Sequence, residues 1–113
     1  MVTIPKNGYL LRIFVGESNK YGHYPLYEVI VLKAREEGLA GATVLRGVMG
    51  FGKGSVLHTA KVLRLSEDLP MVIEIADSLE KIEGFLPTLE EIISDGLVTL
   101  EKVQVIRYAA SEE

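Results

Sequence analysis

An α+β fold, with two helices packed on one face of an antiparallel sheet, is predicted by three features of this 113-residue sequence. Short runs rich in Val, Ile and Leu are separated by two longer stretches in which apolar residues recur every three or four positions. Gly, Pro, Asp and Asn lie between these runs, as is typical of turns. The length and the apolar content of 48% suit a single domain covering residues 1–113.

The N-terminal part of the sequence predicts a strand, a helix and a second strand. Residues 9–15 alternate between two apolar faces, and Gly16 ends this run. Pro25 suits the first position of a helix, and Gly38 suits its C-terminal cap. The second strand is expected at residues 42–48.

The C-terminal part predicts a second helix among further strands. Leu and Ile recur at helical spacing over residues 77–94, and Asp77 and Glu80 are spaced as in a capping box. Pro87 lies inside this stretch and predicts a kink or a short restart. Extended segments are expected at 56–65, 71–76 and 97–108.

The order of the elements, β-α-β followed by a long loop and β-α-β, predicts a ferredoxin-like βαββαβ sandwich. The second face of the sheet then presents Leu, Ile, Val and Phe, unless residues 56–65 cover part of it. Monomers rarely expose a large apolar patch, so we expect copies of the chain to associate through this face. Arg12 lies in an apolar strand, where an unpaired charge is costly, and we expect it to pair with Glu74 or Glu101.

Charge and composition argue against several classes of function. The net charge of −4 disfavours a general nucleic-acid binder. Cys is absent, and the spacing of His23 and His58 matches no metal site, so no metal is expected. The sequence lacks both a signal peptide and a run approaching the roughly 20 apolar residues of a membrane span. We therefore expect a cytoplasmic protein without membrane insertion.

Residues 46–59, RGVMGFGKGSVLHT, form a connection longer than a hairpin needs. Glycine N–H groups can converge on an anion there, with Lys53 as a point charge and Phe51 packed on a ligand. The alternative is a flexible connector whose Phe51 is inserted into its own core. Guanidinium and ammonium groups suit phosphate oxygens, and the candidate partners are Arg46, Lys61, Arg64 and Arg107.

Catalytic chemistry has little support in the sequence. Ser55, His58 and Glu67 supply a nucleophile, a base and an acid, but they lie on a stretch expected to be mobile. Nucleophilic catalysis needs a rigid, oriented base, so we expect no enzyme. Residues 17–24 have enough polar variety to contact a ligand or a partner, and a plain surface turn is the alternative.

Several segments resemble PII signalling proteins. They are GATVLRGVMGFG at 41–52, LPMVIEI at 69–75, and Asp95-Gly96 followed by VIR at 105–107. A narrower resemblance, covering residues 9–108, is to the PII-like family of unassigned function often encoded beside fluoride exporters. Its motifs are GES at 16–18, PLYE at 25–28, AGATVLRG at 40–47, GFG at 50–52 and SEDLPMVIEI at 66–75.

The resemblance implies a ferredoxin-like homotrimer that binds a small effector, an adenine nucleotide (ADP, AMP or ATP), in clefts between subunits, with no obligatory cofactor. It also implies a mobile loop around residues 49–58 that signals to a partner such as a membrane transporter. The positions that match nucleotide-binding residues are Thr43 on the adenine side, Gly50, Phe51, Gly52 and Lys53 at the loop, and Gly96 and Arg107 on the phosphate side.

Two departures from the PII pattern concern the phosphates. Leu97 stands where PII proteins have a lysine, and Ala109 stands where they have a second arginine. These departures count against a triphosphate and leave a diphosphate, a monophosphate or a different adenylyl ligand. Two other hypotheses are a structural or adaptor trimer without a functional nucleotide site, and an enzyme acting on a phosphorylated metabolite.

Overall fold

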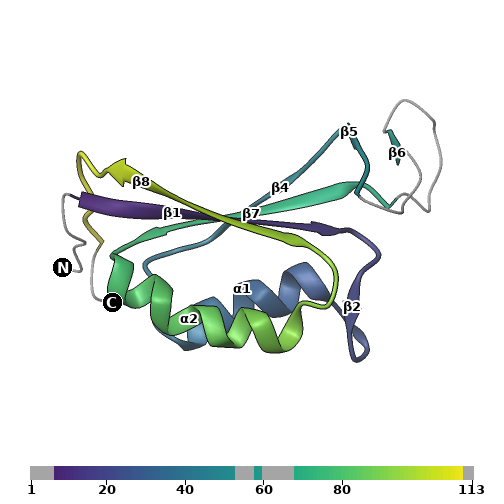
Figure 1. Cartoon of the computed structure of the whole chain (residues 1–113), viewed down its shortest axis with the longest axis horizontal. Coiled ribbons are helices and arrows are strands. Elements are labelled where there is room, and N and C mark those ends of the chain that lie inside the picture. The colour runs from purple at the N-terminus through teal and green to yellow at the C-terminus, as the bar shows by residue number, and fades with distance from the viewer. Residues whose placement is uncertain (1–6, 53–57, 60–67, 111–113) are drawn as a thin grey trace.

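A four-stranded antiparallel sheet lies over two helices in the computed structural model, which describes residues 7–52, 58–59 and 68–110 (Figure 1). The strand order is β4-β7-β1-β8, as a ferredoxin-like fold requires. The elements are β1 (Asn7–Gly16), β2 (Lys20–Tyr21), β3 (Tyr24–Pro25), α1 (Leu26–Glu36), β4 (Thr43–Arg46), β5 (Met49–Gly50), β6 (His58–Thr59), β7 (Pro70–Asp77), α2 (Leu79–Ile92) and β8 (Leu97–Gln104).

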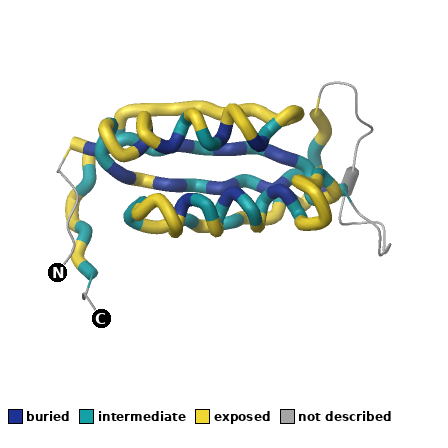
Figure 2. The backbone as a smooth tube through the Cα atoms, turned by 90° about the horizontal axis from the view of Figure 1, so that it is seen from below, coloured by how far each residue is buried: buried dark blue, intermediate teal, exposed yellow. Residues whose placement is uncertain are grey.

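The core lies between the two helices and one face of the central strands β1 and β7. Alternate residues of these strands are buried, because only one face of each strand packs against the helices. The antiparallel register pairs Leu11 with Ile75 and Ile13 with Ile73, and all four are at most 1% exposed. Figure 2 shows the same alternation of buried and less buried residues along the strands, with buried residues recurring on the helices.

Helix α1 ends in a Schellman motif at Gly38. The backbone N–H of Gly38 donates to the Arg35 carbonyl and that of Leu39 donates to the Ala34 carbonyl, at 3.1 and 3.0 Å. Gly38 has φ of +79°, which glycine adopts without steric cost. The predicted end of this helix is therefore confirmed. Pro25 occupies the N-cap position, one residue before the place predicted for it.

Helix α2 differs from its prediction at both ends. Ser78 is the N-cap, and its hydroxyl accepts a hydrogen bond from the Lys81 N–H, so a capping box between Asp77 and Glu80 is wrong. Asp77 belongs instead to the end of β7. The helix runs through Pro87 as one element, which contradicts a restart, and it ends at Ile92 rather than residue 94.

The second face of the sheet carries apolar side chains, as predicted. Because residues 11, 13 and 15 face the helices, Leu10, Arg12 and Phe14 lie on the opposite, open face. Phe14 pairs with Val72 on one side and with Leu97 on the other. Leu45 extends this row to the edge strand β4 and is 49% exposed.

Two predicted strands are shorter in the structure. The strand expected at 42–48 is β4, which ends at Arg46, although the Gly47 N–H still donates to the carbonyl of Pro70, the first residue of β7, at 2.7 Å. The last strand ends at Gln104, opposite Asn7, rather than at residue 108. Of the strand expected at 56–65, only β6 falls within the described residues, where it pairs with β5.

A short hairpin, β2–β3, occupies part of the segment that was expected to be a turn or a contact loop. Tyr21 pairs with Tyr24 across Gly22, whose φ of +64° forms the tight turn. The sequence did not predict these strands, because two paired residues on each side give too little periodicity to recognise.

Replacing Gly84 in α2 by Ala is expected to raise the free energy of unfolding by about 0.5–1 kcal/mol, because glycine is a poor residue within a helix. Gly84 is exposed, and an added Cβ meets no heavy atom within 4 Å. In Gly96→Ala, the Cβ would lie 2.8 Å from the Phe14 carbonyl oxygen, so this control should lower stability. Urea denaturation measures both, and a less stable Gly84→Ala protein would contradict the described helix.

Candidate functional site

A pocket of about 340 Å³ lies on the open face of the sheet, at the end where β4 begins. It is bounded by β1, β7, the start of β4 and the chain that follows β8. Its apolar wall includes Leu10, Ala42, Ala76 and Val105. The polar or charged groups that line it include Thr43, Glu74 and Arg107.

Ala40 forms part of the pocket wall and is held on both sides. Its N–H donates to Oδ2 of Asp77 at 2.8 Å, and its carbonyl accepts a hydrogen bond from the Tyr108 hydroxyl at 2.9 Å. Asp77 is only 3% exposed, and its Oδ1 accepts the N–H of Ser78 at 2.7 Å. These bonds fix the loop before β4 against the end of β7 and the C-terminal chain, so the pocket has a well-defined wall.

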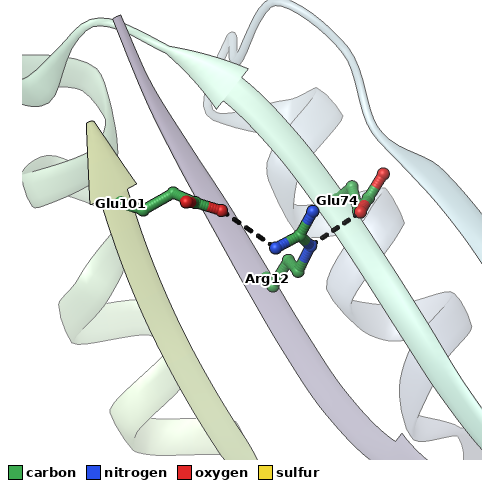
Figure 3. Close-up of polar contacts among 3 residues, drawn as sticks. All are labelled: Arg12, Glu74 and Glu101. Atoms are coloured by element: carbon green, nitrogen blue, oxygen red, sulfur yellow. Dashed lines mark hydrogen bonds and ion pairs between the residues drawn. The ribbon is translucent and has the colours of Figure 1, made fainter. Parts of the chain in front are cut away.

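Arg12 lies between two carboxylates on the open face, as Figure 3 shows. Its Nε is 2.8 Å from Oε2 of Glu74, and its Nη1 is 2.9 Å from Oε1 of Glu101. The predicted pairing of Arg12 is therefore confirmed, with both proposed partners. The hydrogen bond to Glu74 is the main cause of a raised pKa of the Arg12 guanidinium.

Three charged side chains and one threonine form a polar stripe that crosses all four strands. Its members are Glu101, Arg12, Glu74 and Thr43. Thr43 joins it because it lies opposite Glu74 in the β4–β7 register and therefore points to the same face. One end of the stripe, Glu74 and Thr43, also lines the pocket. The ion pairs and the pocket thus share one carboxylate.

The residues predicted for nucleotide binding fall into two groups within one chain. Thr43 and Arg107 line the pocket. Gly50, Phe51 and Gly52 follow the C-terminal end of β4, and Gly96 lies beside Phe14, near the C-terminal end of β1. Both places are at the end of the sheet away from the pocket. Lys53, Lys61 and Arg64 lie outside the described residues.

Arg46 is tied to the same far end of the sheet as the glycine-rich connection. Its Nη2 lies 3.1 Å from Oε1 of Glu17, in a half-exposed ion pair. Gly47 and Gly50 pack against Pro70, since a Cβ at either position would lie 2.8 Å from the Pro70 Cγ. The base of the connection is therefore closely packed on β7.

Phe51 and its neighbours project from this base. Phe51 and Val48 are each 74% exposed, and Met49 is 56% exposed. A Phe51 inserted into its own core, one of the two interpretations of the connection, is therefore wrong. The aromatic ring remains available for a ligand or another chain.

The sequence did not predict that Glu74 and Tyr108 line the pocket, or that Asp77 holds its Ala40 wall. Glu74 was expected only as an ion-pair partner, and Asp77 only as a helix cap. Tyr108 was expected within a strand. An acid at the end of a buried strand, as with Asp77, is a usable signal for a buried acceptor, whereas the contact of Tyr108 with Ala40 joins segments too far apart in the chain to be read from spacing.

Within residues 7–52, 58–59 and 68–110, no group of three or more His, Cys, Asp or Glu side chains could hold a metal ion. No helix in this part of the chain has the length and apolarity needed to cross a membrane.

Comparison with known proteins identifies the family. The model of the DUF190 family, described as "Uncharacterized ACR", matches residues 8–105, and the chain belongs to this family. A UPF0166 protein of Aquifex aeolicus is 44% identical over 99 residues, which cover 86% of this chain and 91% of the relative. A UPF0166 protein of Methanocaldococcus jannaschii is 34% identical over 99 residues, covering 87% and 91%.

Solved structures show the same fold at low sequence identity. CPII, a nitrogen regulatory PII-like protein from Thiomonas intermedia, has a TM-score of 0.61 and 22% identity, covering 89% of this chain and 90% of that one. A Thermus thermophilus protein described as PII-like has a TM-score of 0.64 and 20% identity, covering 94% of both chains. The predicted PII-like, ferredoxin-type fold is therefore confirmed.

Replacing Asp77 by Ala is expected to destabilise the protein by about 2 kcal/mol, because the N–H groups of Ala40 and Ser78 lose their acceptor. Asp77→Asn keeps one of the two side-chain oxygens as an acceptor and should therefore lose less stability than Asp77→Ala. Denaturant unfolding measures stability, and hydrogen exchange at Ala40 measures the local effect. Equal stability of Asp77→Ala and the unmodified protein would contradict the described contacts.

Proposed function

We propose that this chain is a PII-like regulatory protein of the cytoplasm, that it binds an adenine nucleotide of the ADP or AMP type in clefts between the subunits of a homotrimer, and that it forms a single domain. The observation that carries the proposal is the pocket on the open face, where Thr43 and Glu74 lie among apolar side chains and Arg107 supplies a cation. A flat base needs apolar walls with few polar groups, and a phosphate needs a cation.

The comparisons support the choice of ligand. CPII was solved bound to ADP, AMP and bicarbonate, and its fold matches nearly the whole of this chain. In our proposal, Thr43 and Glu74 contact the nucleoside, and Arg107 contacts a phosphate. Leu97 and Ala109, which replace two cations of the PII pattern, favour a ligand with fewer phosphates than ATP.

A trimer would bring together the two groups of predicted residues. Thr43 and Arg107 lie at the pocket, whereas Phe51 and Gly96 lie toward the other end of the sheet. A neighbouring copy packed on the open face could place its Gly50–Gly52 segment over the pocket of the first. The apolar row that includes Phe14, Val72 and Leu45 supports such packing, because burying it is favourable.

Signalling in this proposal passes through the connection around residues 49–58. Phe51 is exposed beside a closely packed base, so a ligand that contacts it stabilises one arrangement of the connection over others. A partner, such as a membrane transporter, would distinguish these arrangements. This role is regulatory rather than catalytic.

The second candidate function is a structural or adaptor trimer without a functional nucleotide site. Leu97 favours it, because this exposed apolar residue stands where a phosphate-binding lysine would be expected. Calorimetric titration with AMP, ADP and ATP, with and without magnesium, separates the two functions. Saturable binding supports the sensor, and no binding of any of these nucleotides supports the adaptor.

Replacing Arg107 by Ala is expected to weaken nucleotide binding about tenfold or more, because a charge-assisted hydrogen bond to phosphate contributes about 1.5–3 kcal/mol. Isothermal titration calorimetry with ADP measures the change. Arg35→Ala removes an exposed cation from α1 and should bind ADP as the unmodified protein does. Equal affinity of the two variants would remove Arg107 from the site.

Replacing Phe14 by Asp is expected to dissociate the trimer, because it introduces a charge into the apolar row of the open face. Leu32→Asp is the matched control, since Leu32 is 62% exposed on α1, in the helix layer. Sedimentation equilibrium should give three chain masses for the unmodified protein and for Leu32→Asp, and less for Phe14→Asp. A monomeric unmodified protein at micromolar concentration would contradict the trimer.

A further inference from the structure

We propose that Glu74 determines which ligand the pocket accepts, by taking a hydrogen bond from a donor group, an amine or a hydroxyl, on the nucleoside end of the ligand. This inference rests on the proposed function, because it assumes that the pocket binds a nucleotide. It assigns to Glu74 a role beyond the ion pair with Arg12.

The position of Glu74 places a charge in an otherwise largely apolar part of the pocket. The residue lies on the open face of β7, directly opposite Thr43, with Ala76 and Leu10 nearby on the same wall. Its side chain is 30% exposed, so the carboxylate reaches the pocket without being buried in the sheet. A ligand that fills this wall therefore has to satisfy a carboxylate.

The two oxygens of Glu74 have different roles. Oε2 accepts the Arg12 Nε–H at 2.8 Å. Figure 3 shows the other oxygen pointing away from Arg12, and no hydrogen-bond donor to it is seen among residues 7–52, 58–59 and 68–110. One oxygen is thus fixed by a guanidinium, and the other is an acceptor oriented in advance.

An acceptor fixed in this way discriminates between ligands by the cost of mismatch. A ligand donor that reaches Oε1 replaces the water lost on binding. A ligand acceptor or a methyl group in the same place leaves a desolvated carboxylate oxygen without a donor, which costs more than the hydrogen bond gains. Sites built to bond a polar group reject analogues that lack it for this reason.

The charges of Glu74 and Arg107 determine how a ligand is oriented in the pocket. Phosphate is repelled by Glu74 and attracted by Arg107, which lines the pocket from the chain after β8. The anionic end of a ligand therefore lies toward Arg107, and its uncharged donor lies toward Glu74. The exocyclic amine of adenine and the ribose hydroxyls are the two sources of such a donor in an adenine nucleotide.

The pair Glu74 and Glu101 offers a matched test, because each supplies one carboxylate to Arg12 and only Glu74 lines the pocket. In Glu74→Gln, Arg12 retains the amide oxygen as its acceptor, so the amide NH₂ turns toward the pocket as a donor. Glu101→Gln changes the same ion-pair network without altering the pocket.

Isothermal titration calorimetry on the full chain measures the affinities for AMP, IMP and 2′-deoxy-AMP. If the donor is the base amine, the unmodified protein should bind AMP about tenfold or more tightly than IMP. If the donor is a ribose hydroxyl, it should bind AMP about tenfold or more tightly than 2′-deoxy-AMP. Glu74→Gln should weaken the binding of AMP about tenfold. If the donor is the base amine, this variant should also shift the preference toward IMP, whose base oxygen accepts a hydrogen bond from the new amide NH₂. Glu101→Gln should keep the unmodified affinities and ratios.

The remaining outcomes overturn the inference. If the unmodified protein binds AMP, IMP and 2′-deoxy-AMP equally, or if Glu74→Gln behaves as Glu101→Gln does, Glu74 does not select the ligand while the proposed function stands. If the unmodified protein binds no nucleotide, the proposed function itself fails and the inference fails with it.

Discussion

Burial of alternate residues of β1 and β7 under two helices is the constraint on which the rest of the structure depends. Leu11, Ile13, Ile73 and Ile75 are almost fully buried, so the register between the central strands cannot slip by one residue without turning apolar side chains away from the core. The same alternation forces Arg12 onto the open face. A cation at this position needs partners from the strands on both sides, and each of these strands supplies a carboxylate.

The open face follows from the same constraint. Two helices cover one face of a four-stranded sheet, so apolar residues of the other face remain exposed in a single chain. The polar stripe interrupts this apolar surface, and its Glu74 end meets the pocket. In the proposed trimer, association through this face would bury the apolar row and complete the ligand site at once. Subunit contact and ligand binding would then be coupled, because both use the same surface.

Sequence reasoning predicted the fold well because its signals are local and repeated. The alternation in residues 9–15 and the Gly38 cap are patterns that a few neighbouring residues determine. The ends of β4 and β8 were missed, since they depend on pairing with β7 and β1, which are distant in the chain. For the site, the sequence pointed to Thr43 and Arg107 through a family resemblance, and it missed the contact of Tyr108 with Ala40 because no spacing encodes it.

The charged side chains around the proposed site indicate which part of a nucleotide it would distinguish. Arg12 is committed to two carboxylates, and Arg46 is paired with Glu17, so neither is a ready phosphate partner. Among the residues that the structure describes, the cation that lines the pocket is Arg107, and the positions of two further PII cations hold Leu97 and Ala109. With fewer cations for the phosphates of the proposed ligand, the affinity difference between one phosphate and three would be reduced. In the proposed site, discrimination would then fall on the nucleoside end, where Thr43 and Glu74 supply polar groups beside an apolar wall.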